Sequence, residues 1–384
     1  MSVIISVSVS LRLHEHCAAS CHAGNIAQEN RNRNAKLFDV NRGNESPHKG
    51  QSKMLAINKQ ALYILGVDLG GTNVRAAVTD HTGKILGSGR APSNATEGIR
   101  NTVGRIADAA ETAIASAGVK KSEIAGLGIG VPGHIDDKNG VVIWAPNFYE
   151  DGLPYRNVAL AEPVTAQIGL PVIMGNDANV AALGEFRFGA GRDVQTMVMV
   201  TLGTGIGGGI ILNGKLWTGA NGGAGEIGHI IIAAGERGGS AAFGSLESMG
   251  QIAAIVERAS RKICDGRKSI LAERVGYDWH LLTPKIIADA AEEGDALAIE
   301  TFEETGRYVG IGIASMINLL NPEMVVIGGG VSQAGDLILE PIRRACLANG
   351  IPSLVKSCPI VPATLGDDAG ILGGVSLILD AIDG

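Results

Sequence analysis

The sequence lacks the features that mark several large classes of protein. Its five cysteines are scattered and form no C-x-x-C pair, so a disulfide framework is not indicated and a reducing cytoplasm is the simplest setting. No apolar run reaches the ~18 residues of a membrane-spanning helix. The net charge of −7 argues against general binding to nucleic acid or to an anionic membrane. No G-K-[ST] follows a glycine cluster, which excludes the P-loop.

The first sixty residues differ in character from the rest. Residues 1–11 are largely apolar but have no positive charge before them, so a secretory signal is poorly supported; a bacterial-type compartment signal is the minor alternative. Residues 14–53 are too polar to bury a core. We predict that residues 1–60 are a disordered leader, or an upstream extension of a reading frame whose natural start is Met54.

Glycine is abundant, with 55 residues in a chain that is 45% hydrophobic. The glycines have no G-X-Y period, which excludes collagen. They gather at the ends of apolar runs, where tight turns let backbone approach a ligand. The pattern of strand, glycine turn and strand occurs twice, from Ile64 and from Met197. These repeats, followed by alternating helices and strands, predict an α/β protein with two related lobes and a cleft between them. Helices are expected at residues 101–117, 247–262, 283–293, 296–320 and 369–382.

Three glycine turns are candidates for binding a nucleotide. Asp68–Asn73 places a carboxylate at a strand end before backbone that can fold around an Mg²⁺-bound polyphosphate. A plain hairpin turn is the alternative. Gly203–Gly209 has the same place in the second repeat, so two such turns facing a cleft could hold both ends of a triphosphate. Gly328–Gly330 lies between a strand and a helix and is a candidate adenosine site.

Two further segments carry polar side chains suited to a hydroxyl-bearing substrate. Asp177 follows a strand at the start of a helix and could take a proton from a hydroxyl. The alternative is that Asp177 only caps that helix. Glu226 and His229, three residues apart, could bind vicinal hydroxyls together with Glu247. A surface turn with a satisfied histidine is the alternative there.

The motifs, in their order and spacing, resemble the ROK family of bacterial sugar kinases within the actin–hexokinase-like ATPase superfamily. DLGGTNVRAAV resembles the first phosphate motif, TLGTGIGGGII the second and VIGGGVS the adenosine motif. GLGIGVPG, WAPN, GNDANVAALGE and GAGEIGH are similar to the sugar-site and connecting segments. The resemblance runs from Ile64 to the C-terminus. It implies two ribonuclease H-like lobes (βββαβα duplicated): residues 61–176, completed by a C-terminal helix at about 368–384, and residues 177–367.

The resemblance also implies a role for individual residues. Asp177 is expected to be the catalytic base, and Asp68 to act on Mg²⁺ through water. The sugar is expected to contact Asn147, Asn176, Asp177, Glu226, His229 and Glu247. ATP is expected to lie against Asp68, Gly70, Gly71, Thr72, Asn73, Gly203, Thr204, Gly205, Gly329 and Gly330.

The activity implied is ATP-dependent phosphorylation of a hexose at its 6-hydroxyl, with glucose favoured over N-acetylmannosamine, fructose, mannose and allose. A cytoplasmic homodimer is expected, with no nucleic-acid or membrane partner. A sugar-sensing ROK repressor and a non-kinase ATPase of the same superfamily are the competing classes. Residues 1–60 lack the amphipathic helix pair and the basic patch of a DNA-binding domain. The combined sugar-site residues argue against the ATPase.

One departure from the family pattern concerns zinc. Many ROK proteins carry C-x-C-G-x-x-G-C-x-E after the histidine, and its cysteines bind a structural zinc. Here Gly238, Ser240 and Ser245 stand where the three thiolates would be. A glycine and two hydroxyls cannot replace thiolate ligands of Zn²⁺. We therefore predict no zinc site, with Glu247 retained for the sugar.

Overall fold

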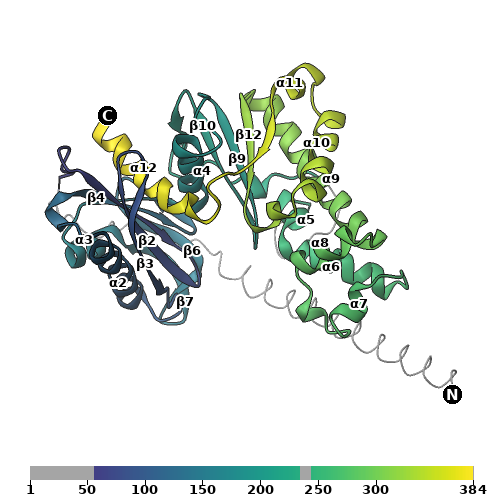
Figure 1. Ribbon diagram of the computed structural model, residues 1–384, viewed down its shortest axis with the longest axis horizontal. Coiled ribbons are helices and arrows are strands. Elements are labelled where there is room, and N and C mark those ends of the chain that lie inside the picture. The colour runs from purple at the N-terminus through teal and green to yellow at the C-terminus, as the bar shows by residue number, and fades with distance from the viewer. Residues whose placement is uncertain (1–55, 234–243, 384) are drawn as a thin grey trace, which may run out of the picture.

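The computed structural model describes residues 56–233 and 244–383, and Figure 1 shows them as two α/β halves side by side. Each half holds a five-stranded sheet, in the order β3-β2-β1-β4-β8 and β11-β10-β9-β12-β13. In both sheets the first three strands are antiparallel and the last two are added in parallel. The sheets therefore match strand for strand, which confirms the predicted duplicated α/β fold. Their strands are β1 (Tyr63–Leu69), β2 (Asn73–Asp80), β3 (Ile85–Pro92), β4 (Ile124–Val131), β8 (Val172–Asn176), β9 (Met197–Leu202), β10 (Ile206–Leu212), β11 (Lys215–Leu216), β12 (Met324–Gly328) and β13 (Ile360–Pro362).

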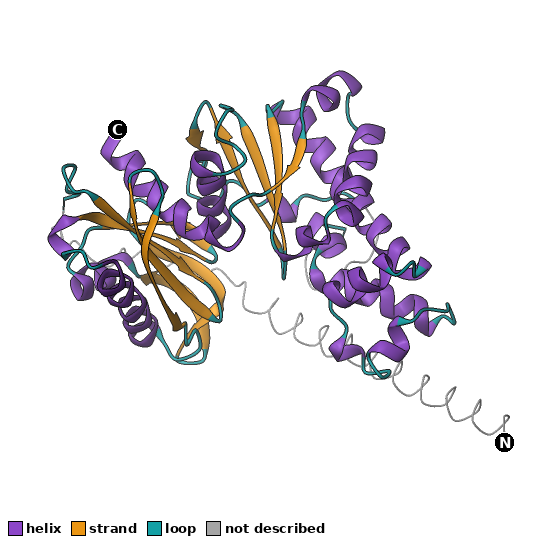
Figure 2. Cartoon of the chain, in the orientation of Figure 1, coloured by secondary structure: helices purple, strands orange, loops and turns teal. Residues whose placement is uncertain are grey.

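Helices cover the faces of both sheets (Figure 2). Those expected at residues 101–117, 283–293, 296–320 and 369–382 are present. The helix expected at residues 247–262 is instead two helices, because Gln251 is extended and the next N–H donates to the Gly203 carbonyl at 2.9 Å. The α-helices are α2 (Ile99–Ala117), α3 (Ala161–Ile168), α4 (Asp177–Phe188), α5 (Leu246–Gly250), α6 (Ile252–Cys264), α7 (Leu271–Arg274), α8 (Pro284–Glu292), α9 (Ala296–Leu320), α10 (Asp336–Asn349), α11 (Pro352–Ser357) and α12 (Ala369–Asp383), and the 3₁₀ turns are η1 (Lys121–Glu123), η2 (Ile227–His229), η3 (Trp279–Leu281), η4 (Gly330–Ala334) and η5 (Gly366–Asp368).

A third, smaller sheet was not expected from the sequence. It consists of β5 (His134–Asp136), β6 (Val141–Glu150) and β7 (Leu153–Ala159), all antiparallel. The pairing of β6 with β7 shifts register between Ala145 and Tyr149. Such a bulge re-aims the side chains around it, and it falls on the segment that carries Asn147.

Two helices lie where the halves meet. Helix α12 packs on the first sheet: a Cβ at Gly66 would lie 2.2 Å from the Ile371 carbonyl oxygen, and only glycine permits that approach. Helix α4 contacts both sheets, since Val180 lies against Gly130 of β4 and Ala182 against Gly209 of β10. The exact division of the chain into lobes at residue 176 stays a prediction.

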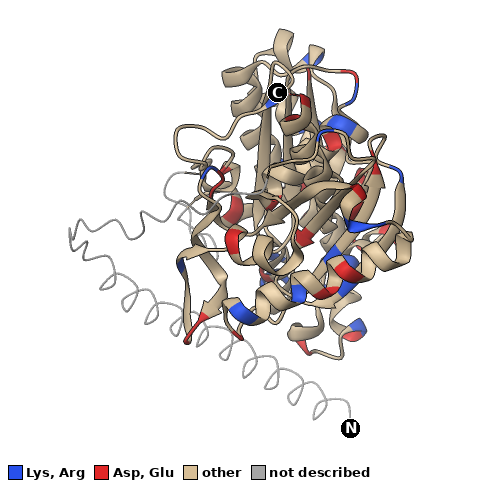
Figure 3. Cartoon of the chain, turned by 90° about the vertical axis from the view of Figure 1, so that its left-hand side faces the viewer, with Lys and Arg blue, Asp and Glu red and all other residues tan. Residues whose placement is uncertain are grey.

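Residues 1–55 of the predicted leader lie outside the described residues. Its last residues contact the first half, since the Asn58 N–H donates to the Ala125 carbonyl at 3.2 Å. Within the described ranges, no helix combines the length and apolarity needed to cross a bilayer. Acidic and basic positions are interspersed along the ribbon in Figure 3. Among the ion pairs, Arg187 of α4 pairs with Asp380 of α12.

Candidate active site

Asp177 is the first residue of α4, directly after β8. The cap of this helix is Asn176, whose Oδ1 accepts the Asn179 N–H at 3.0 Å. Asn176 also donates from Nδ2 to the Gly133 carbonyl at 3.0 Å and to Asp177 Oδ1 at 3.1 Å. The alternative in which Asp177 serves as the helix cap is therefore wrong. Asn176 and Asp177 are both of a type that often caps helices, and here Asn176 is the cap.

The Asp177 carboxyl group lies in an environment that disfavours its charge. Burial is the main cause that raises its pKa from 3.8 to about 6. A hydrogen bond from the Ala178 N–H, 2.9 Å from Oδ1, acts in the opposite direction. The negative charges of Asp68 and Glu226 raise the pKa further. The structure thus brings three predicted site residues within electrostatic range of one another, around a carboxyl group whose pKa is near neutral.

Asp68, at the end of β1, makes an ion pair that the sequence analysis missed. Its Oδ2 accepts from Arg75 Nη2 at 2.7 Å, and both side chains are about one-quarter exposed. The two residues are direct partners across the β1–β2 hairpin. Arg75 also reaches Asp367, at 3.6 Å. A conformationally defined carboxylate therefore lies at the base of the first glycine turn, with a cation beside it.

Hydrogen bonds fix the conformation of the first turn, from its own backbone and from Ser93, which follows β3. The Gly70 N–H donates to the Asn73 carbonyl at 2.9 Å. Ser93 donates from its hydroxyl to the Gly71 carbonyl at 2.7 Å. Gly71 and Thr72 are exposed. The tip of the turn is therefore both fixed and accessible to a ligand.

The second turn is tied to Glu247. The Ile206 N–H donates to Glu247 Oε2 at 2.9 Å, and a Cβ at Gly205 would lie 2.5 Å from the same oxygen. A Cβ at Gly228, in the Glu-x-x-His segment, would lie 3.2 Å from Glu247 Cβ. Glu247 on α5 therefore stands between the second glycine turn and the segment predicted to bind sugar.

The third turn packs against the second. Gly329 has φ +82°, and a Cβ there would lie 2.4 Å from the carbonyl oxygen of Leu202, the residue before Gly203. Only glycine fits this position. Gly329 and Gly330 are exposed, so the second and third turns form one continuous backbone surface.

Glu226 directly precedes the short 3₁₀ turn η2, and His229 is its last residue. Glu226 Oε2 lies 4.0 Å from His229 Nε2, and both side chains are more than half exposed. Asn147 is also exposed, on β6. All three side chains can therefore turn toward a ligand, although Asn147 makes no hydrogen bond to the other predicted residues within the part of the chain that the structure describes.

The predicted absence of zinc concerns a segment that is only partly described. Gly238 and Ser240 lie outside the described residues. Ser245 is fully buried, and its hydroxyl oxygen accepts the Ser248 N–H at 3.2 Å as the cap of α5. Ser245 therefore has a structural task at the start of the helix that carries Glu247.

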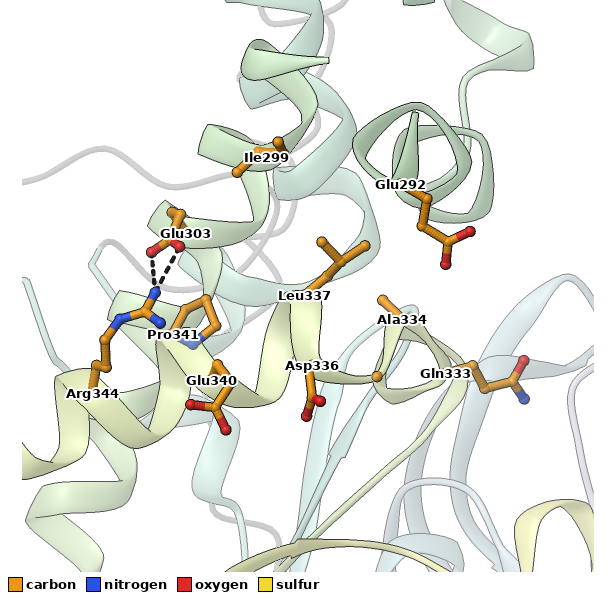
Figure 4. Close-up of a pocket in the computed structure, with 11 residues that line it drawn as sticks. Glu292, Ile299, Glu303, Gln333, Ala334, Asp336, Leu337, Glu340, Pro341 and Arg344 are labelled. Atoms are coloured by element: carbon orange, nitrogen blue, oxygen red, sulfur yellow. Dashed lines mark hydrogen bonds and ion pairs between the residues drawn. The ribbon is translucent and has the colours of Figure 1, made fainter. Parts of the chain in front are cut away.

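A cavity of about 520 Å³ opens beside the third turn, between α8, α9 and the η4–α10 junction (Figure 4). None of the predicted site residues lines it, but Gln333 and Ala334 follow Gly330 within η4. Arg344 donates to both carboxylate oxygens of Glu303 at 2.6 Å. Most of the lining is acidic or apolar, and includes Glu292, Asp336, Glu340, Ile299, Leu337 and Pro341.

The fold and these turns place the chain among proteins of the actin–hexokinase-like ATPase fold. Residues 64–381 match the model of the ROK family. The chain is 38% identical over 321 residues to a glucokinase of Halalkalibacterium halodurans, a match that covers 82% of this chain and 94% of that protein. The chain belongs to the ROK family, and the prediction made from its motifs is confirmed.

Two further relatives represent the kinase and the repressor among the classes considered for the chain. The crystal structure of a ROK family glucokinase from Streptomyces griseus, in complex with glucose and AMPPNP, is similar with a TM-score of 0.70 and 34% identity, covering 82% of this chain and 98% of that one. A xylose repressor of Caldicellulosiruptor bescii is 31% identical over 327 residues, covering 85% of this chain and 80% of that protein.

Proposed function

We propose that this chain transfers the γ-phosphoryl group of ATP to the 6-hydroxyl of glucose, with Asp177 as the base. One observation carries the proposal: a carboxyl group with a pKa of about 6 lies within electrostatic range of both Asp68 and Glu226. Asp68 adjoins a glycine turn suited to phosphate, and Glu226 belongs to the segment suited to sugar. A base near both of these residues lies where the sugar hydroxyl would meet the phosphoryl group. Glucokinase relatives at 34–38% identity support the same activity.

The three glycine turns are the proposed ATP site. Gly70, Gly71, Thr72 and Asn73 would lie against the phosphates on one side, and Gly203, Thr204, Gly205, Gly329 and Gly330 on the other. The N–H groups of Gly70 and Gly203 already donate to the Asn73 and Gly205 carbonyls, so the other N–H groups of the turns are the proposed phosphate donors. We place the nucleoside in the cavity beside Gly330. Its acidic lining would repel phosphates, but it suits the neutral base and ribose, whose N–H and O–H groups can donate to carboxylates.

Asp68 fits the part of the magnesium site that the protein would supply. Mg²⁺ prefers oxygen ligands, retains several waters and is commonly bound by one or two carboxylates plus substrate phosphates. Asp68 is a single carboxylate beside the first turn, held in place by Arg75. When bound, Mg²⁺ would neutralise charge on the transferring phosphate.

The proposed sugar site draws on both halves. Asn147 and Asp177 belong to segments around the first sheet, and Glu226, His229 and Glu247 to segments around the second. Asn176 is better described as a positioning residue, because both of its amide hydrogens and one oxygen lone pair are used within the protein. It orients Asp177 and keeps one lone pair for a sugar hydroxyl.

Phosphoryl transfer needs positioning and charge neutralisation more than covalent chemistry from the protein. Asp177 accepts the proton of the 6-hydroxyl as the phosphoryl group moves. Closure of the halves over the sugar would exclude water, which otherwise competes as the acceptor.

The dependence of rate on pH tests the role of Asp177. A general base acts in its ionised form, so kcat/KM for glucose should fall about tenfold for each pH unit below about 6. The residual kcat/KM of Asp177→Asn, which has no ionisable group at this position, should not show this fall at low pH. A wild-type profile that stays flat from pH 7 to pH 5, in a buffer range where the protein remains folded, would contradict the assignment.

A coupled assay with ATP and a panel of hexoses tests the proposed substrate. Glucose should give the highest kcat/KM among glucose, N-acetylmannosamine, fructose, mannose and allose, and ATP consumption should require sugar. ATP turnover without sugar would favour the non-kinase ATPase. Replacing ATP by polyphosphate tests the donor.

The repressor alternative rests on relatives such as the xylose repressor, and DNA binding with or without sugar discriminates it from the kinase. We further propose that the protein acts in the cytoplasm as a homodimer, which light scattering of the purified chain would test.

A further inference from the structure

Glu185 is a buried carboxylate on α4 that the proposed mechanism does not use. It lies two helical turns after Asp177, and its exposed fraction is 0%. A buried carboxylate is costly unless several donors satisfy it. The identity of those donors therefore indicates what the residue does.

Both oxygens of Glu185 accept hydrogen bonds from distant parts of the chain. Oε1 accepts the N–H groups of Thr364 and Leu365 at 2.9 and 2.7 Å. Oε2 accepts the N–H of Ala190 at 2.9 Å and the hydroxyl of Thr364 at 3.2 Å. The donors come from two segments, one directly after α4 and one directly before α12.

These two segments are the links between the two large sheets. The chain leaves the first sheet through α4 and residues 189–196, which lead to β9 of the second. It returns through residues 363–368, which lead from β13 to α12 on the first sheet (Figure 1). A single carboxylate is therefore bonded to both crossings.

The packing around Glu185 leaves little freedom at this point. A Cβ at Gly189 would lie 2.0 Å from Glu185 Oε2, so any side chain where the first crossing begins would displace this carboxylate. A Cβ at Gly184 would lie 2.4 Å from the Ala369 carbonyl oxygen, at the start of α12. The two helices thus meet backbone to backbone beside the carboxylate that joins the crossings.

We propose that Glu185 is a positioning residue that fixes the two crossings to each other and so sets the angle between the halves. That angle determines whether Asp177, which directly follows β8 of the first sheet, meets the sugar held by Glu226 and Glu247 of the second half. The inference rests on the proposed function, because it matters only where both halves contact one substrate.

The test is Glu185→Gln, which keeps the shape of the side chain but turns an NH₂ group toward N–H donors. An unsatisfied buried donor costs enough to loosen the crossings, so we expect kcat/KM for glucose to fall by roughly tenfold or more. The Kd of a fluorescent ATP analogue should rise too, because glycine turns of both halves would hold its phosphates. The Kd of adenosine, which would contact only the third turn and the cavity of the second half, should change by less than about twofold. Small-angle scattering should show a glucose-induced compaction in the wild type that is smaller in the variant.

Glu323→Gln is the matched control. Its carboxylate also accepts two backbone N–H groups, from Gln195 and Thr196 at 2.7 and 2.8 Å. These bonds hold the last two residues of the first crossing to the residue before β12 of the second sheet. They do not bond one crossing to the other, so glucose-induced compaction should persist in Glu323→Gln. If Glu185→Gln yields no folded protein, Thr364→Ala removes one donor on one crossing and should shift kcat/KM in the same direction by about two- to fivefold.

The inference is overturned if Glu185→Gln folds with wild-type compaction and wild-type kcat/KM, or if Thr364→Ala, used in its place, leaves both unchanged. Equal effects of Glu185→Gln and Glu323→Gln on kcat/KM and on compaction would also overturn the inference. The loss of any carboxylate that accepts backbone N–H groups would then be enough to produce them. A wild-type enzyme with no glucose phosphorylation would instead contradict the proposed function.

Discussion

Asp177→Asn is expected to lower kcat by ~10²–10⁴-fold, the usual contribution of a general base. The asparagine keeps the size of the side chain and can still accept from Asn176 and from the Ala178 N–H, but it cannot take a proton from the 6-hydroxyl. KM for ATP should change little, because the glycine turns are untouched. Steady-state kinetics with saturating glucose and ATP measure the effect.

Asp295→Asn is the control for a purely structural role. Asp295 caps α9 by accepting the Ala298 N–H at 2.9 Å, far along the chain from the proposed site. If Asp177 served only the start of its helix, both variants would lose a little stability and keep kcat. Near-normal turnover in Asp177→Asn would remove the base assignment.

Asp177→Asn should also make the protein more stable at pH 8. Because the folded pKa is raised from 3.8 to about 6, the stabilising contribution of this carboxyl group is fully present below pH 3.8 and is lost as the pH rises through about 6. A difference of about two units corresponds to at most ~3 kcal/mol. A higher melting temperature together with lower kcat would exclude unfolding as the cause of the lost activity.

Gly205→Ala is expected to lower kcat/KM for glucose by roughly 10- to 100-fold, the scale of hydrogen bonds made by charged groups. The new Cβ would lie 2.5 Å from Glu247 Oε2. That oxygen is at the end of a flexible side chain, so the carboxylate should swing away while the fold survives. The variant thus displaces Glu247 without truncating it. Isothermal calorimetry with glucose, alongside kinetics, measures the loss.

Two comparisons make this result specific. Gly104→Ala, on α2, has no heavy atom within 4 Å of the new Cβ and should leave activity unchanged. Glu247→Gln should reproduce much of the effect of Gly205→Ala, and combining the two should add little because they act on one contact. Unchanged glucose affinity in Gly205→Ala would show that the carboxylate position is irrelevant to the sugar.

The duplicated fold was predictable because its signals are local. Apolar strands interrupted by glycine at equivalent places in two segments predict matching hairpins without any knowledge of packing. The same hairpin could have revealed the partner of Asp68, since residues equidistant from a tight turn face each other, and Arg75 is that residue. Both Asp68 and Arg75 belong to the motif DLGGTNVRAAV, so the hairpin register alone predicts that they pair.

Other parts of the site depend on contacts that sequence spacing does not encode. Asn176 and Asp177 are both good caps, and only the path of the chain decides which one bonds the helix. Glu247 meets Ile206 and Glu185 meets Thr364 across 41 and 179 positions. The third sheet was not predicted because WAPN, which lies in its bulged strand β6, was interpreted only as a segment of the sugar site.

The packing of α12 on the first sheet has a consequence for synthesis. Besides Gly66, Gly128 of β4 lies against the backbone of this helix, at Gly374. During translation the first sheet emerges early, but the helix that closes this face emerges only after the whole second half. Part of the apolar surface of the first half therefore stays uncovered until the second half has left the ribosome. A chain that stops before residue 369 should require chaperone protection rather than fold as two independent units.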